Sequence, residues 1–268
     1  MTRHRGGAPI PWPIAVPAGI GLGFLTLPLA ALLVRAPWTG LGTALGTPEA
    51  RAALRLSLLT ATTATAVCAL LGVPLAWVLA RGGYRGLRLV RALVTLPLVL
   101  PPVVGGVALL LAFGRRGVVG HWLDAGVGVR LPFTPAGVVV AEAFVAMPFL
   151  VLAVEGALRG ADPRLEEAAA TLGASRWVTF RRVTLPLVLP GLVAGMVLCW
   201  ARALGEFGAT ITFAGSFPGT TETLPIAAYS SFEGSGQVGE AVTLSLILLA
   251  ISILVLVVLR DRWLGALR

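Results

Sequence analysis

The sequence predicts an all-α polytopic membrane protein with six transmembrane helices. Of its 268 residues, 57% are hydrophobic and only 12% are charged, whereas a soluble domain carries about 25% charged residues. The mean hydropathy is +0.90. Several apolar runs reach the roughly 20 residues that a helix needs to cross about 30 Å of hydrocarbon. Composition and run length together therefore predict a chain embedded in a bilayer.

Six apolar segments are the expected spans. They cover residues 14–34, 54–80, 90–113, 134–158, 185–212 and 241–259. The first follows Arg3 and Arg5 and could be mistaken for a signal peptide. It is longer than an ordinary signal-peptide core, and no clear small-x-small cleavage site follows it. We therefore expect it to be retained as a span.

Several expected spans contain proline, which interrupts the helical hydrogen-bond ladder. Membrane helices tolerate such breaks where neighbouring helices or cavity water satisfy the freed backbone groups. Simple kinked packing and a moving or pore-lining role are both open. The prolines are Pro97, Pro101 and Pro102 in the third span, Pro148 in the fourth, and Pro186 and Pro190 at or in the fifth.

The arginines predict the orientation, because cytoplasmic loops of membrane proteins carry an excess of basic residues. With the N-terminus inside, fourteen arginines fall in cytoplasmic segments, six fall outside, and Arg202 lies within the fifth span. Both termini are then cytoplasmic, in a multi-pass protein of the inner (cytoplasmic) membrane. The cytoplasmic set is Arg3, Arg5, Arg81, Arg85, Arg88, Arg91, Arg159, Arg164, Arg176, Arg181, Arg182, Arg260, Arg262 and Arg268. The external set is Arg35, Arg51, Arg55, Arg115, Arg116 and Arg130.

The chain reads as one domain, because no helix is long and polar enough to form a separate soluble unit. Residues 1–53 hold the N-terminal tail, the first span and an external loop. Residues 54–260 form the membrane core, which includes a distinctive loop at 160–186, and residues 261–268 form a cytoplasmic tail.

Composition also excludes several functions. The net charge of +9 could suggest a nucleic-acid partner, but the arginines flank apolar runs and form no basic stripe with interleaved aromatic residues. All 21 basic residues are arginine, so the chain lacks the lysine of a phosphate-binding Walker A loop. Cys68 and Cys199 lie in apolar runs, and His4 and His121 are too few and too far apart for a metal site. We expect no catalytic residue and no metal or other cofactor on this chain.

The loop at 160–186 predicts two short helices on the cytoplasmic side. Asp162 is a good N-cap and Pro163 suits the first helical position. Glu166 and Glu167 then lie near the positive end of the helix dipole. Gly173 is a natural stop, because glycine adopts the left-handed conformation without penalty.

A second short helix should follow Ser175, which can cap it. Trp177, Phe180 and Val183 recur at three-residue steps, which is typical of an amphipathic helix. The small residues before Gly173 leave a flat surface suited to another protein. A surface hairpin that lies on the lipid headgroups would have the same features.

The spacing of this loop resembles the EAA loop of ABC importer permeases, and only Val183 departs from it, where isoleucine is usual. In that family the loop is the coupling helix that docks in a cleft of the ATPase subunit. The resemblance implies a type I ABC importer permease with the motor on a separate chain, which would bind ATP and Mg. The matching residues are Glu167, Ala168, Ala169, Gly173, Leu185 and Pro186.

Segments outside the loop, on both sides of it, resemble the molybdate permeases of that superfamily. They are residues 97–102, 113–117, 201–213, 218–219 and 223–229, and the likeness covers most of the chain from about Leu54 onward. The resemblance implies a homodimer of this chain with two ATPase subunits and an external substrate-binding protein. Permeases for sulfate share the Arg-Ala-x-Gly-Glu core, so sulfate, thiosulfate or tungstate is the nearest alternative substrate.

Arg202, Glu206 and Glu142 are charged residues that lie well inside the expected spans, away from their ends. Arg202 and Glu206 are one helical turn apart and can face each other, and Glu142 in the fourth span could also pair with Arg202. A charge at the bilayer centre costs about 2.5–3.5 kcal/mol on insertion scales, which makes it a candidate for function. A structural ion pair that fixes helix register and a role in the pathway or its gate are both open.

Four further acidic residues do not indicate a specific function. Glu155 at the cytoplasmic end of the fourth span needs no special role, and Glu222, Glu233 and Glu240 read as a solvated external loop. An ion-coupled secondary transporter is the alternative of another class, but such proteins commonly show internal repeats, and none is convincing here. A membrane scaffold that transports nothing would leave Arg202 and Glu206 only a structural role.

Overall fold

The computed structural model describes residues 11–40, 42, 46–234 and 238–266. Every regular element in those ranges is helical. The helices are α1 Trp12–Val34, α3 Pro48–Arg81, α4 Leu87–Val99, α5 Pro102–Phe113, α6 Gly120–Val127, α7 Pro135–Gly160, α8 Pro163–Thr171, α9 Arg176–Thr179, the π-helix η1 Phe180–Thr184, α10 Leu185–Leu204, α11 Gly208–Ala214, α12 Leu224–Gly234 and α13 Val238–Ala266. The described elements agree with the all-α prediction.

Five helices are long and apolar enough to cross a bilayer, and a sixth span arises if the bent pair α4–α5 counts as one. Four of the six expected spans appear as the single helices α1, α3, α7 and α13. The chain is thus a multi-pass membrane protein.

The third expected span is not one continuous helix, which corrects the prediction. The chain bends by 120° between α4 and α5. Leu100 is extended (φ −65°, ψ 133°) and Pro101 caps α5. A residue before proline disfavours the α-helical conformation, and here two prolines follow in sequence. The sequence Leu100–Pro101–Pro102 therefore causes the break between α4 and α5.

The fifth expected span is also shorter than predicted. α10 ends at Leu204, Gly205 caps it, and residues 208–214 form the separate helix α11. The prediction had continued the helix to residue 212 because the run stays apolar. At the other end, α9 and η1 continue directly into α10, so residues 176–204 form one span-length unit.

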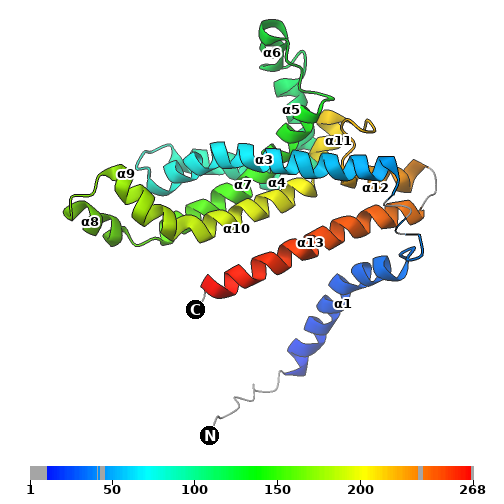
Figure 1. The fold of residues 1–268 in the computed structure, drawn as a ribbon, viewed down its shortest axis with the longest axis horizontal. Helices are drawn as coiled ribbons and strands as arrows, with labels where there is room; N and C mark the ends of the chain where they lie inside the picture. The colour runs from blue at the N-terminus through cyan, green and yellow to red at the C-terminus, as the bar shows by residue number, and fades with distance from the viewer. Residues whose placement is uncertain (1–10, 41, 43–45, 235–237, 267–268) are drawn as a thin grey trace.

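The centre of the molecule is built from α3, α7 and α10, which lie side by side (Figure 1). The contact between α10 and α7 uses small residues. A Cβ added at Gly191 would lie 2.4 Å from the Ala157 Cβ, and one added at Gly195 would lie 2.9 Å from the Ala153 Cβ. Gly191 and Gly195 form a GxxxG pattern, which lets membrane helices approach closely.

The other elements extend from this centre. Figure 1 shows α8 and α9 at one end of the α3–α7–α10 bundle and α12 at the opposite end, with α5 and α6 projecting to one side. Within the described residues α1 has no buried side chain, and it packs against α13. An apolar helix with every face exposed is suited to lipid.

Candidate functional site

The hairpin formed by α8, α9 and η1 begins with the cap that its sequence predicts. The Asp162 carboxylate accepts a hydrogen bond from the Arg164 N–H at 3.0 Å, and Pro163 is the first helical residue. Asp162 thereby satisfies one of the backbone donors that a helix start leaves free. The start of α8 is thus fixed by local sequence.

Gly173 ends α8 in the left-handed conformation, with φ +82°. The Gly173 N–H donates to the Ala170 carbonyl and the Ala174 N–H donates to the Ala169 carbonyl, both at 3.0 Å. This pair of bonds is the Schellman arrangement, which requires a residue that tolerates positive φ. Ala169 therefore contributes its carbonyl group to the turn, and the left-handed geometry expected at Gly173 is confirmed.

The chain then runs from the hairpin into α10 without a flexible link. The Ser175 side chain caps α9, accepting from the Val178 N–H at 3.4 Å, and η1 leads directly into Leu185 and Pro186. Proline cannot donate a hydrogen bond, and its ring clashes with the carbonyl four residues back. The widened π-turn before Pro186 accommodates this, so the hairpin continues into α10 as unbroken helical backbone.

The outer surface of the hairpin carries exposed apolar side chains. Leu172 is 88% exposed and Trp177 is 67% exposed. Glu167, Ala168, Gly173 and Pro186 are exposed as well, whereas Ala169 and Leu185 are partly covered. Exposed apolar groups rimmed by polar ones indicate a surface that meets either a partner protein or the lipid headgroups.

Glu166 attaches the hairpin to the bundle. Its Oε1 accepts from Arg81 Nη2 at 2.8 Å and from the Thr184 hydroxyl at 2.9 Å. Arg81 is the last residue of α3 and Thr184 is the last of η1. One carboxylate oxygen thus joins α8 to the end of α3 and to the segment that enters α10. The sequence prediction gave Glu166 only a dipole role, because a contact 85 residues away along the chain leaves no local signal.

We expect Glu166→Gln to loosen the hairpin. Partly exposed ion pairs contribute up to about 1 kcal/mol, so backbone amides of residues 163–184 should exchange hydrogen about fivefold faster. A double-mutant cycle with Arg81→Gln should show that the two effects are not additive, since the residues share one contact. Additive effects in hydrogen exchange would contradict the attachment.

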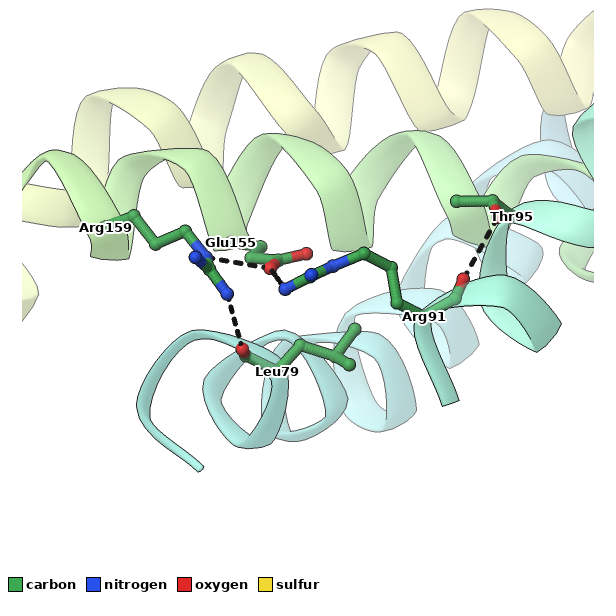
Figure 2. Close-up of polar contacts among 5 residues, drawn as sticks. All are labelled: Leu79, Arg91, Thr95, Glu155 and Arg159. Atoms are coloured by element: carbon green, nitrogen blue, oxygen red, sulfur yellow. Dashed lines mark hydrogen bonds and ion pairs between the residues drawn. The ribbon is translucent and has the colours of Figure 1, made fainter. Parts of the chain in front are cut away.

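A second carboxylate, Glu155, fixes the base of the hairpin. Figure 2 shows Glu155 of α7 between Arg91 of α4 and Arg159 of α7. The Arg159 Nε donates at 2.9 Å, and Arg159 Nη2 also donates to the Leu79 carbonyl of α3 at 3.0 Å. Glu155 is buried, and a buried carboxylate requires such partners. The expectation that Glu155 has no special role is therefore wrong with respect to packing, because this group joins three helices.

Arg202 and Glu206 form the ion pair that their spacing predicts. Arg202 Nη1 lies 2.6 Å from Glu206 Oε2. Arg202 is in the last turn of α10, and Glu206 lies in the connection to α11. Glu206 Oε1 accepts from the Ala209 N–H at 2.9 Å, inside α11. Glu206 is buried, at 2% exposed, and so holds both the arginine and the start of α11.

Arg202 lines a cavity of about 140 Å³ at the break between α4 and α5. Leu100, Pro101, Pro102 and Gly105 form part of the same lining. A site for one water needs about 10–15 Å³, so this space could hold several waters or a small anion. The first N–H groups of α5 have no partner within their own helix, and they begin at this break. The guanidinium of Arg202 and the start of α5 therefore border the same cavity.

Two glycines hold the broken helices together. A Cβ added at Gly106 of α5 would lie 2.5 Å from the Thr212 Cβ, and one added at Gly208 would lie 2.6 Å from the Pro102 Cβ. Neither glycine could carry a side chain without displacing α5 from α11. Because α11 follows Arg202 in the chain, this close approach of α5 to α11 holds Arg202 near the break between α4 and α5.

Glu142 does not pair with Arg202, which corrects the prediction that it could. Its Oε1 accepts from the Thr60 hydroxyl of α3 at 2.9 Å, and its Oε2 has no hydrogen-bond partner among the described residues. Glu142 is 1% exposed. An unsatisfied polar atom at such a site is costly, and an intramembrane acid of this kind remains a candidate for function.

The fold is that of a multi-pass helical membrane protein with an exposed hairpin at one end of the bundle (Figure 1). The model of the family described as "Binding-protein-dependent transport system inner membrane component" matches residues 70–268. The chain belongs to this family.

Curated relatives are similar over most of the chain. It is 49% identical over 242 residues to the molybdenum transport system permease protein ModB of Mycobacterium tuberculosis, covering 90% of each protein. It is 43% identical over 218 residues to ModB of Escherichia coli K12, covering 81% of this chain and 94% of that protein. The sulfate transport system permease protein CysT of the same strain is 40% identical over 201 residues, covering 74% of this chain and 72% of that protein.

Solved structures show the same fold. A bacterial ABC transporter involved in the import of the acidic polysaccharide alginate matches with a TM-score of 0.73 and 18% identity, covering 94% of this chain and 92% of that chain. At this identity the likeness concerns the fold alone.

Proposed function

We propose that this chain is the membrane-spanning permease subunit of an ATP-driven ABC importer for molybdate. The observation that carries the proposal is the 49% identity to a molybdenum permease over nine-tenths of both chains. A second observation supports the proposal: the chain has a hairpin with an exposed apolar surface that leads directly into a membrane helix. The nearest alternative substrate is sulfate, because a sulfate permease is 40% identical over a shorter length.

The machinery of this proposal needs partner chains. Two copies of the permease would enclose the path, and two ATPase subunits would bind ATP and Mg and hydrolyse the nucleotide. An external binding protein would deliver the anion. Glu167, Ala168, Ala169, Gly173, Leu185 and Pro186 would carry the motion of the ATPase into α10, and Arg202, Glu206 and Glu142 would line the pathway or its gate. The chain itself would change no covalent bond.

The substrate is tested by uptake in cells that lack their own molybdate importer. Cells that express this chain with its ATPase and binding protein should accumulate labelled molybdate, and unlabelled sulfate in excess should compete weakly. Uptake of sulfate with equal or greater efficiency would assign the sulfate alternative. Uptake that persists without the ATPase would favour an ion-coupled transporter.

The orientation is tested with single cysteines at two exposed aliphatic positions. Leu172 on the hairpin is 88% exposed, and Val118 between α5 and α6 is 81% exposed. An impermeant thiol reagent should label Val118→Cys in intact cells and Leu172→Cys only after the membrane is opened. The native Cys68 and Cys199 are buried and should give little background. The reverse labelling pattern would overturn the arginine-based orientation.

A further inference from the structure

A cavity rich in arginine lies at the same end of the bundle as the hairpin. Its volume is about 580 Å³, and Arg85, Arg88, Arg91 and Arg159 line it. It adjoins the connection from α3 to α4, immediately after Arg81, which binds Glu166 of the hairpin. The four arginines that line this cavity belong neither to the cavity beside Arg202 nor to the hairpin.

The positive charge of this cavity is only partly compensated. Glu155 is shared by Arg91 and Arg159 (Figure 2), which leaves one excess charge between them. Arg85 and Arg88 are exposed and form no ion pair with any residue that the structure describes. Three positive charges therefore face one cavity without a matching protein anion, which favours a negatively charged ligand.

The surroundings of the cavity suit a ligand that is part lipid. Tyr84 lines the cavity and is 63% exposed, and tyrosine is enriched where a membrane meets water. On α4, the helix that carries Arg88 and Arg91, Leu89 is 66% exposed and Leu93 is 58% exposed. These leucines offer an apolar surface beside the arginines, such as an acyl chain would cover. A soluble inorganic anion has no apolar group that could cover these leucines.

We propose that the cavity lined by Arg85, Arg88, Arg91 and Arg159 binds the phosphate group of an anionic phospholipid from the cytoplasmic leaflet. Arginine matches phosphate geometry through several parallel N–H donors. Basic pockets between membrane helices on the cytoplasmic side hold lipid headgroups for this reason. The choice of leaflet rests on the proposed function, in which the neighbouring hairpin meets a cytoplasmic ATPase. A bound headgroup would contact Arg91 and Arg159 and so brace the base of the hairpin.

The test uses the full-length permease with its ATPase in nanodiscs of phosphatidylcholine, with or without phosphatidylglycerol. Bound phosphatidylglycerol is counted by native mass spectrometry. Each interfacial arginine contributes about 1 kcal/mol toward anionic lipid, so Arg85→Gln with Arg88→Gln should weaken its apparent affinity about thirtyfold. The control changes Arg115 and Arg116 to glutamine in the connection between α5 and α6, which projects to one side of the bundle (Figure 1). Equal melting temperatures in pure phosphatidylcholine would show that both variants fold.

Each outcome decides the proposal. Retention of phosphatidylglycerol by the Arg85/Arg88 variant, or an equal loss in the Arg115/Arg116 control, would overturn the site. Displacement of the lipid by inorganic phosphate would show a soluble oxyanion as the ligand and overturn the lipid assignment. Lipid binding is measured separately from uptake. A chain that does not transport molybdate could therefore still bind the lipid, and a chain that transports molybdate could fail to bind it.

Discussion

Gly173→Val should abolish transport while the permease still inserts into the membrane. Gly173 has φ +82°, a conformation that costs a non-glycine residue about 1–3 kcal/mol, with β-branched residues worst affected. Relieving that strain would break the two hydrogen bonds that close the turn after α8. The exposed surface of the hairpin would then lose its shape, and uptake should fall at least about tenfold.

The measurement pairs uptake with co-purification of the ATPase. Gly160→Val is the matched control, because Gly160 ends α7 outside the left-handed region and an added Cβ there meets no atom within 4 Å. The control should keep near-normal uptake and ATPase binding. Normal transport by the Gly173 variant would remove the hairpin from the coupling role.

Local signals in the sequence were enough to predict the hairpin. Asp162, Pro163 and Gly173 each act on the backbone within a few residues of themselves, and the structure has the expected cap, start and turn. Hydropathy likewise located α1, α3, α7 and α13, because a helix must stay apolar to cross a bilayer. The break at Leu100–Pro101 was not predicted because membrane helices tolerate proline, so the apolar run was interpreted as one kinked helix.

Contacts between distant segments could not be predicted from the sequence. The attachment of Glu166 to Arg81, and the junction of Glu155 with Arg91, join residues 64 to 85 positions apart. The pairing of Arg202 with Glu206 was predictable because it spans one helical turn. The partner of Glu142 was not, since Thr60 lies 82 residues away. A pattern such as Gly191–Gly195 could have suggested the close contact of α10 with a small-residue helix face.

Replacement of both Arg202 and Glu206 by glutamine should preserve the amount of protein and abolish uptake. Glu206 holds the Ala209 N–H as well as Arg202, so an alanine there would also release the start of α11. Glutamine keeps an oxygen acceptor for that N–H and removes the charge. The single Arg202→Gln leaves Glu206 as a buried charge without its cation, which costs about 3–5 kcal/mol, and its membrane abundance should fall.

The double variant separates a structural pair from a pathway residue. Arg202 lies about 26 Å along α10 from Leu185, and it lines the cavity where α4 and α5 part. A unit charge there attracts an anion by several kcal/mol at intermediate dielectric, so its loss should lower uptake at least about tenfold even when abundance recovers. Arg115→Gln with Asp124→Asn is the control, because it removes charges that are paired away from the Arg202 cavity, including the pair of Asp124 with Arg130. Recovery of both abundance and uptake in the Arg202/Glu206 double variant would mean that the pair only fixes α10 against α11, and that the anion passes without contacting Arg202.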